Sequence, residues 1–167
     1  MNQVEHGTFD KYYNLWILLG RAKDAIHRVR EIELKQYNVS LEQTIILDVI
    51  SDLANRATPT EIGSNAFRKT NTISVIAKRM EKRGLLKRQR SKKGKNSIIL
   101  SFTEKGEQVY QQTRKREVIW NIFSKLSAEQ IDQLHSILSI LLSEATNELC
   151  NRKNEELRKV LSIPRIK

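Results

Sequence analysis

The amino-acid sequence predicts a mainly α-helical protein with one small β-hairpin. Apolar residues recur at three- and four-residue steps over long stretches, as in helices that bury one face. Only six Gly and two Pro stand among the 167 residues, which predicts long helices with short connections. The pattern changes to alternation near residues 97–102, as in a half-buried strand. One Cys excludes an internal disulfide.

Capping signals set the expected helix boundaries. In a capping box, two side chains three residues apart each bond the backbone amide of the other residue. Three such pairs are present: Ser40 with Gln43, Thr58 with Glu61, and Ser127 with Gln130. Thr103 is a further expected cap, and Gly84 is suited to the left-handed position after a helix. The expected helices span residues 8–36, from 41 onward, 59–66, 71–83, 104–124, 128–151 and a short 155–162.

Apolar stripes give the expected buried faces, and two strands complete the pattern. The second helix is expected to bury Leu41, Ile45, Val49 and Leu53, and the fourth Ile73, Ile76, Ala77 and Met80. Residues 85–90 and 97–102 form the predicted hairpin. The loop between the strands is polar, contains Gly94 and is strongly basic.

The net charge of the chain comes from one segment. Residues 68–95 contain twelve Lys and Arg and a single acid, Glu81, so this segment alone carries the +11 of the whole chain. Like charges at this density repel one another unless an anionic partner neutralises them. Polyphosphate is the expected partner, and a basic surface that serves only solubility is the alternative.

Helix two, the short third helix, a tight turn, helix four and the basic hairpin follow the order of a winged helix-turn-helix. An α-helix fits the DNA major groove, and its first residues then meet base edges. Base contacts are expected from Thr70, Asn71, Thr72, Ser74 and Val75, and backbone contacts from Arg68, Lys69, Lys78 and Arg79. The wing would contribute Arg88, Arg90, Lys92, Lys93, Lys95 and Asn96.

The segment from Pro59 to Gly106 resembles the winged helix-turn-helix of the MarR family of transcription regulators. The residues that carry the resemblance are 67–74 (FRKTNTIS), 79–86 (RMEKRGLL) and 100–106 (LSFTEKG). The resemblance implies a homodimer that binds a near-palindromic duplex site, and commonly a small-molecule effector that relieves repression. We therefore expect a DNA-binding repressor rather than an activator.

One departure from the family pattern lies in the wing. Members of the family usually have Asp-x-Arg there, and Gly94, Lys95 and Asn96 occupy these positions in this chain. We expect Lys95, together with Lys92 and Lys93, to replace the missing arginine by charge. A lysine contact is less directional than an arginine fork, so weaker discrimination of minor-groove shape is expected.

The chain is expected to divide into three parts. Residues 1–38 form an N-terminal dimerisation helix, 39–106 the winged helix-turn-helix lobe, and 107–167 the C-terminal dimerisation helices. Aromatic residues such as Tyr12 and Trp16, and leucines such as Leu138 and Leu141, are too apolar for permanent exposure. Burial against a second copy is the favoured explanation, and a monomer whose end helices cover one another is the alternative.

Other sites receive weaker indications. Trp16, Trp120 and Phe123 are candidates for an effector pocket, but a place in the dimer core is the favoured interpretation of the same residues. No residue pattern indicates catalysis, a metal site or a cofactor. The absence of an apolar run of membrane-spanning length and of a signal peptide predicts a cytoplasmic protein that does not enter the membrane. A non-specific nucleic-acid-binding module (nucleoid or RNA-binding) and a protein-docking lobe stay open as alternatives.

Overall fold

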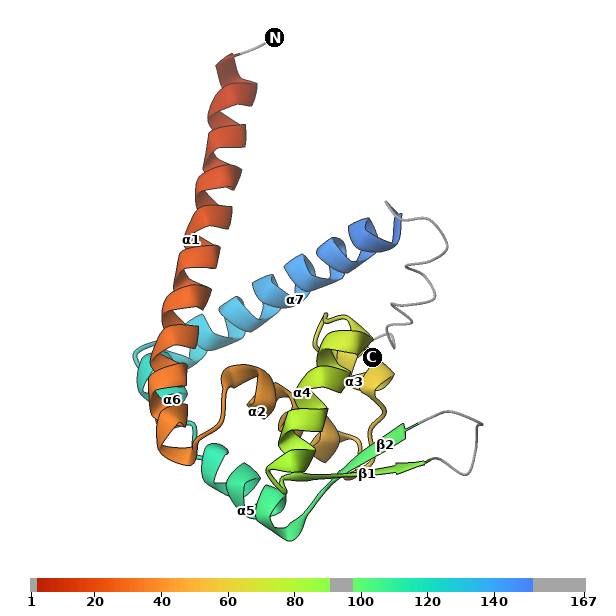
Figure 1. The fold of residues 1–167 in the computed structure, drawn as a ribbon. Helices are drawn as coiled ribbons and strands as arrows, with labels where there is room; N and C mark the ends of the chain where they lie inside the picture. Colours follow the sequence, from red (N-terminus) through yellow and green to blue (C-terminus); the bar gives the residue numbers. More distant parts are fainter. Residues whose placement is uncertain (1–2, 91–97, 152–167) are drawn as a thin grey trace.

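A computed structural model describes residues 3–90 and 98–151 of the chain (Figure 1). The elements in order are α1 (Gln3–Leu34), a 3-10 turn η1 (Lys35–Tyr37), α2 (Leu41–Asp52), α3 (Pro59–Asn65), α4 (Thr70–Lys82), β1 (Leu86–Arg90), β2 (Ile98–Phe102), α5 (Glu104–Thr113), α6 (Glu117–Phe123) and α7 (Ala128–Asn151). The mainly helical fold with one β-hairpin is confirmed. The short helix expected at 155–162 lies outside the described residues.

The helices begin where the capping signals predict. Both reciprocal hydrogen bonds form in the boxes of α2 and α3, and the Ser127–Gln130 pair makes the same two bonds before α7. Thr103 Oγ1 accepts the Gly106 amide at the start of α5. Gly84 has φ +72° after α4, in the left-handed region that favours glycine.

A compact lobe is built from α2 to α5 and the hairpin. The strands β1 and β2 are antiparallel, with Leu86 opposite Phe102, and Ala57 forms an isolated bridge with Leu100. The lobe core is made of residues that are at most 7% exposed: Leu34, Val39, Ile46, Leu47, Ile50, Ala57, Ile62, Ile73, Ala77, Met80, Leu85, Leu86, Leu100, Phe102 and Tyr110. This core therefore reaches from the end of α1 into α5, past both limits of the expected 39–106 lobe.

The predicted buried face of α2 is wrong by about one residue. Ile46, Leu47 and Ile50 are fully buried, whereas the predicted stripe is half-buried and its last member, Leu53, is exposed. The segment from Leu41 to Asp52 is apolar on most sides, so its spacing does not fix which side faces the core. In α4 the prediction is confirmed for Ile73, Ala77 and Met80, and Ile76 is half-buried.

The single helix predicted over residues 104–124 is also wrong, because the chain breaks between α5 and α6. Arg116 adopts φ +48°, a left-handed conformation that ends the helical path. The break turns α6 onto α1, against which it packs, while α5 stays with the lobe. The apolar spacing stops at Tyr110 and resumes at Val118, because residues 111–117 (QQTRKRE) contain no apolar side chain; this gap is the sequence signal that could have indicated the break.

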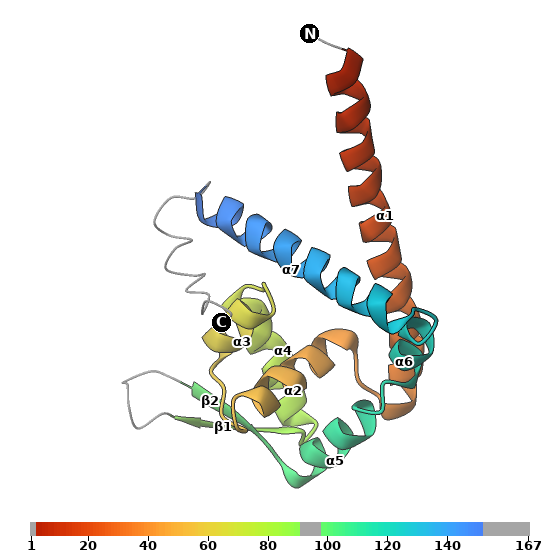
Figure 2. The same cartoon turned by 180° about the vertical axis from the view of Figure 1, so that it is seen from behind.

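The two longest helices diverge from the lobe. In Figures 1 and 2, α1 ends and α7 begins in a common region near α6, and the opposite ends of the two helices lie well apart in both views. Large apolar side chains on both helices are exposed, among them Phe9, Tyr12, Trp16, Leu18, Ile137 and Ile140. The alternative of end helices that cover one another within a single chain does not hold for the described residues.

Candidate nucleic-acid interface

The turn between α3 and α4 positions the first residues of α4. Gly63 O accepts the Arg68 amide at 2.8 Å, and Phe67 has a left-handed φ of +52°. A Cβ on Gly63 would lie 2.7 Å from Arg68 O, too close for any side chain. Glycine at 63 thus allows the two helices to approach and fixes where α4 begins.

The first half of α4 presents small polar groups to solvent. Asn71 and Thr72 are exposed, Val75 is half exposed, and Thr70 and Ser74 are half-buried. The opposite face of α4 carries Ile73, Ala77 and Met80 into the core. The helix is therefore held by its apolar side, and the groups that could meet base edges are free to do so.

Exposed cations flank these polar groups. Arg68 and Lys69 precede the first turn, and Lys78 and Arg79 lie one to two turns further along α4. The N-terminal end of a helix also attracts phosphate through its unpaired backbone amides. Lys82 and Lys87 are further exposed cations of the same segment, in addition to the predicted site residues. Their place in the +11 segment was the signal that could have identified them.

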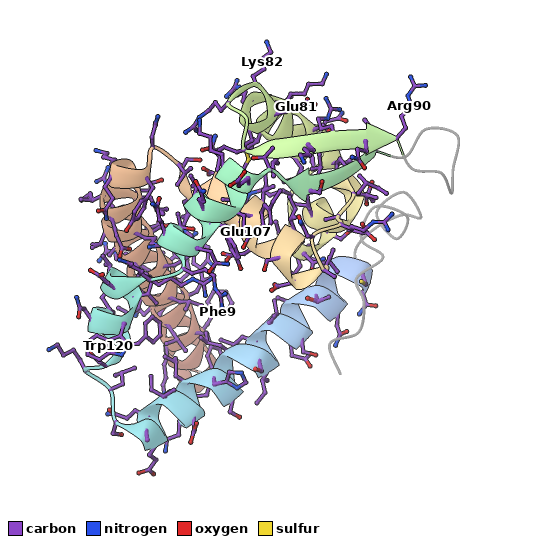
Figure 3. The ribbon with its side chains drawn as sticks, turned by 90° about the horizontal axis from the view of Figure 1, so that it is seen from below. Phe9, Glu81, Lys82, Arg90, Glu107 and Trp120 are labelled. Atoms are coloured by element: carbon purple, nitrogen blue, oxygen red, sulfur yellow. The ribbon has the colours of Figure 1, made fainter. Side chains whose placement is uncertain are left out.

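The two arginines in the described part of the wing have different surroundings. Arg90 is exposed at the end of β1, and Figure 3 shows its side chain pointing away from the lobe, as does that of Lys82. Arg88 is 19% exposed and its Nη1 lies 3.3 Å from Glu81 Oε2, while its Nε is buried without a hydrogen-bond partner. The remaining candidates, Lys92, Lys93, Lys95 and Asn96, lie outside the described residues.

One further arginine of the basic segment holds the lobe together. Arg83, half-buried after α4, donates to the carbonyl of Asn38 and to Gln43 Oε1 (3.1 Å). Lys105 in turn donates to Arg83 O at 3.1 Å. Up to Arg90, the basic segment thus divides into cations that face solvent and cations, Arg83 and Arg88, that are engaged within the lobe.

The candidate effector residues lie apart from this surface. Trp16 is 64% and Trp120 is 69% exposed, and Phe123 is half-buried. Figure 3 shows Trp120 on α6, far from Lys82 and Arg90. A small hollow at the lobe surface has a different lining: Glu42, Ile45, Ala66, Arg68, Thr72, Ile73 and Ile76.

Neither a metal centre nor a membrane span is found in the described ranges. No group of three or more His, Cys, Asp or Glu side chains among residues 3–90 and 98–151 is arranged to hold a metal ion. In the same ranges, no helix combines the length and apolar character that crossing a bilayer requires.

Comparison with known proteins shows which proteins share this arrangement. A family model described as transcriptional regulator SarA/Rot matches residues 28–113. The organic hydroperoxide resistance transcriptional regulator of Bacillus subtilis is 28% identical over 109 residues, which are 65% of this chain and 74% of that protein.

Two solved structures have the same fold. The organohalide-sensing regulator RdhR, in its 2,4-dichlorophenol-bound form, superposes with a TM-score of 0.74 at 25% identity, over 86% of this chain and 85% of that one. A mutant of MarR from E. coli in complex with operator DNA superposes with a TM-score of 0.73 at 18% identity, over 80% and 97% of the two chains.

Proposed function

The chain belongs to the SarA/Rot family of transcriptional regulators, and from this premise we propose that it binds a near-palindromic duplex DNA site as a homodimer and represses transcription there. The observation that carries the proposal is the first half of α4, where exposed polar groups have exposed cations on both sides. The opposite face of this helix is buried in the core of the lobe. The winged helix-turn-helix fold predicted from the sequence is confirmed, and it fits a regulator rather than an enzyme.

The division of roles on α4 follows from side-chain chemistry. Asn71 can bond an adenine edge with its side-chain carbonyl oxygen and amino group together, whereas Lys78, one to two turns further along α4, is placed for contacts to phosphate. Thr70, Thr72, Ser74 and Val75 would add base contacts, and Arg68, Lys69 and Arg79 backbone contacts. In the wing, Arg90, Lys92, Lys93, Lys95 and Asn96 would meet the neighbouring minor groove, and Arg88, paired with Glu81, would support β1 behind them.

The two copies would join through α1, α6 and α7. The exposed apolar side chains of α1 and α7 need cover that the single chain does not provide. A twofold axis between the copies would present two α4 helices to successive major grooves, with half-sites centred about 10 bp apart.

Selection from a random duplex library tests the function directly. The full-length protein is expected to enrich a near-palindromic sequence, with a log–log salt slope of about −5 to −9 if six to ten phosphates are contacted. Asn71→Ala should relax preference at one position of each half-site, and Lys78→Ala should weaken all sequences alike. If random competitor DNA displaces the protein as effectively as the enriched site does, the non-specific alternative is favoured. A log–log salt slope near −1 would exclude specific and non-specific nucleic-acid binding alike.

We also propose that a small aromatic molecule binds beside Trp120 and Phe123 of α6 and relieves repression. Trp16 lies on α1 about 25 Å along the helix from Glu33, which contacts the start of α6, so within one chain it is not part of the same site. RdhR, which shares the fold, binds 2,4-dichlorophenol, and that compound is the probe. The chain contains only two tryptophans, Trp16 and Trp120, so its intrinsic fluorescence reports on the site. Saturable quenching together with loss of DNA binding is expected. Quenching on dimerisation alone would instead assign these residues to the dimer core.

A further inference from the structure

Charged side chains meet where the lobe joins the long helices. Arg30 and Glu33 lie near the end of α1, Asp48 lies on α2, and Arg116 lies in the break between α5 and α6. These four residues are called the junction cluster below. Figures 1 and 2 place this junction at the lower end of α1, on the side of the lobe away from the hairpin.

Two members of the junction cluster hold both sides of the helix break. Arg30 and Glu33 form an ion pair, and their side chains are only 7% and 9% exposed. Arg30 Nη2 donates to Thr113 O, at the last residue of α5, over 2.6 Å. The Val118 amide, in the first turn of α6, donates to Glu33 Oε1 over 3.3 Å. One buried ion pair of α1 therefore fixes where α5 ends and where α6 begins.

The other two members connect the break to the lobe. Arg116 Nη2 donates to Asp48 Oδ1 at 2.5 Å, across 68 residues of sequence. The left-handed backbone of Arg116 directs the side chain from the break toward α2. Because both side chains are partly exposed, at 48% and 37%, the contact can change without opening the core.

The contact with Arg116 offsets only part of the cost of burying Asp48. Burial, together with the nearby charge of Asp52, raises the pKa of Asp48 above its ordinary value, although the charge and hydrogen bond of Arg116 and the charge of Arg30 act in the opposite direction. The ionised carboxylate is therefore less favourable in the fold than in water, even with its partner in place. A directional charge pair still restricts the orientation of the two elements that it joins.

We propose that the junction cluster holds the DNA-reading lobe at a fixed angle to α1 and α6, so that Asp48 and Arg116 are positioning residues that determine which half-site separation the dimer accepts. The inference rests on the proposed function, since it requires two lobes on one duplex. Tilting a lobe about the junction moves its α4 relative to the α4 of the other copy. The separation of the two α4 helices must match the separation of the two half-sites along the duplex. A tilt that changes the first distance therefore changes the half-site spacing that the dimer prefers.

The test uses operators that differ only in spacing. The half-site enriched by the wild-type protein is placed in duplexes whose centre is lengthened or shortened by one to three base pairs. The wild-type protein should lose about tenfold in affinity or more per added base pair. Arg116→Asn removes the charge and retains a residue that tolerates the left-handed backbone. In Arg116→Asn and in Asp48→Asn the affinities across the series should fall within about threefold of each other.

Matched controls separate this inference from a general loss of folding or of DNA binding. Lys115→Ala removes a neighbouring exposed charge and should keep the wild-type spacing profile. Thermal melting of each variant shows whether the lobe is folded, and binding to a single half-site shows whether α4 still reads DNA. Variants that are folded and keep the sharp wild-type spacing profile would overturn the inference. A wild-type protein that enriches no site would instead overturn the proposed function.

Discussion

The lobe and the two long helices treat apolar surface in opposite ways. In the lobe, side chains such as Ile46, Ile62, Met80 and Leu100 are completely buried within one chain. On α1 and α7, side chains such as Phe9, Trp16 and Ile140 are more than half exposed. The core of the lobe is therefore buried within a single copy. The long helices instead expose apolar side chains of the kind that obligate dimers bury between two copies. Substitutions in the two regions should accordingly have different consequences: loss of folding in the first and loss of assembly in the second.

The largest loss of stability is expected for a substitution at a closely packed position in the lobe. A Cβ on Gly106 would lie 1.9 Å from Leu85 O, so Gly106→Ala must displace the start of α5 from the segment that connects α4 to β1. We expect a loss of about 3 kcal/mol or more in the free energy of unfolding, measured by urea denaturation. Gly20→Ala on α1 is the control, because the added Cβ meets nothing within 4 Å in the chain. Equal unfolding curves for Gly106→Ala and the wild type would contradict the close contact.

The second largest effect is expected on dimerisation, from substitutions on the exposed apolar face of α1. The double substitution Leu15→Asp and Leu19→Asp places two charges on one exposed stripe of α1. If a second copy covers this stripe, removing two buried leucines should weaken the dimer at least about a hundredfold. Sedimentation equilibrium would then show the mass of one chain, while circular dichroism shows an unchanged lobe.

A matched control uses the polar side of the same helix. Arg21→Glu also changes the charge of an exposed residue of α1, and it should leave the mass in solution at twice that of one chain. A dimer that survives the two leucine substitutions would show that α1 does not lie in the interface.

Local signals predicted the lobe well because each of them acts within a few residues. The capping boxes at Ser40 and Thr58 and the cap at Thr103 fix helix starts through hydrogen bonds three residues apart, and all of them form. The alternation that ends at Phe102 predicts β2 for the same reason. The outward position of Asn71 follows from the apolar spacing of Ile73, Ala77 and Met80 on the other face of α4.

Features that depend on distant partners could not be predicted. The break at Arg116 is held by Arg30 and Glu33, more than eighty residues earlier, and locally only the polar run 111–117 accompanies it, which does not fix where the helix ends. The buried face of α2 depends on which elements surround it, because its sequence is apolar on most sides. The engagement of Arg88 with Glu81 likewise requires the approach of β1 to α4, which composition does not show.

A smaller effect should distinguish two arginines of the same strand. Arg88→Ala removes a largely buried side chain and leaves Glu81 unpaired, so the free energy of unfolding should fall by about 1 kcal/mol. Arg90→Ala removes an exposed side chain and should change it by less than about 0.5 kcal/mol. Both variants should bind DNA less tightly, as measured by fluorescence anisotropy. Equal stability of the two variants would show that the contact between Arg88 and Glu81 contributes nothing to the lobe.

The smallest effect is a pH dependence at the junction between the two regions. Because the pKa of Asp48 is raised in the folded chain, the folded state holds this proton more tightly than the unfolded state does. The contribution of Asp48 to stability is therefore complete below its unfolded pKa and is lost as the pH rises through the folded value. Relative to Asp48→Asn, the wild-type protein should lose free energy of unfolding between acidic pH and neutrality. Urea denaturation of both proteins at several pH values measures this difference. If the wild type instead gains stability over Asp48→Asn as the pH rises, the ion pair with Arg116 outweighs the burial of the carboxylate, and Asp48 stabilises the junction as well as orienting it.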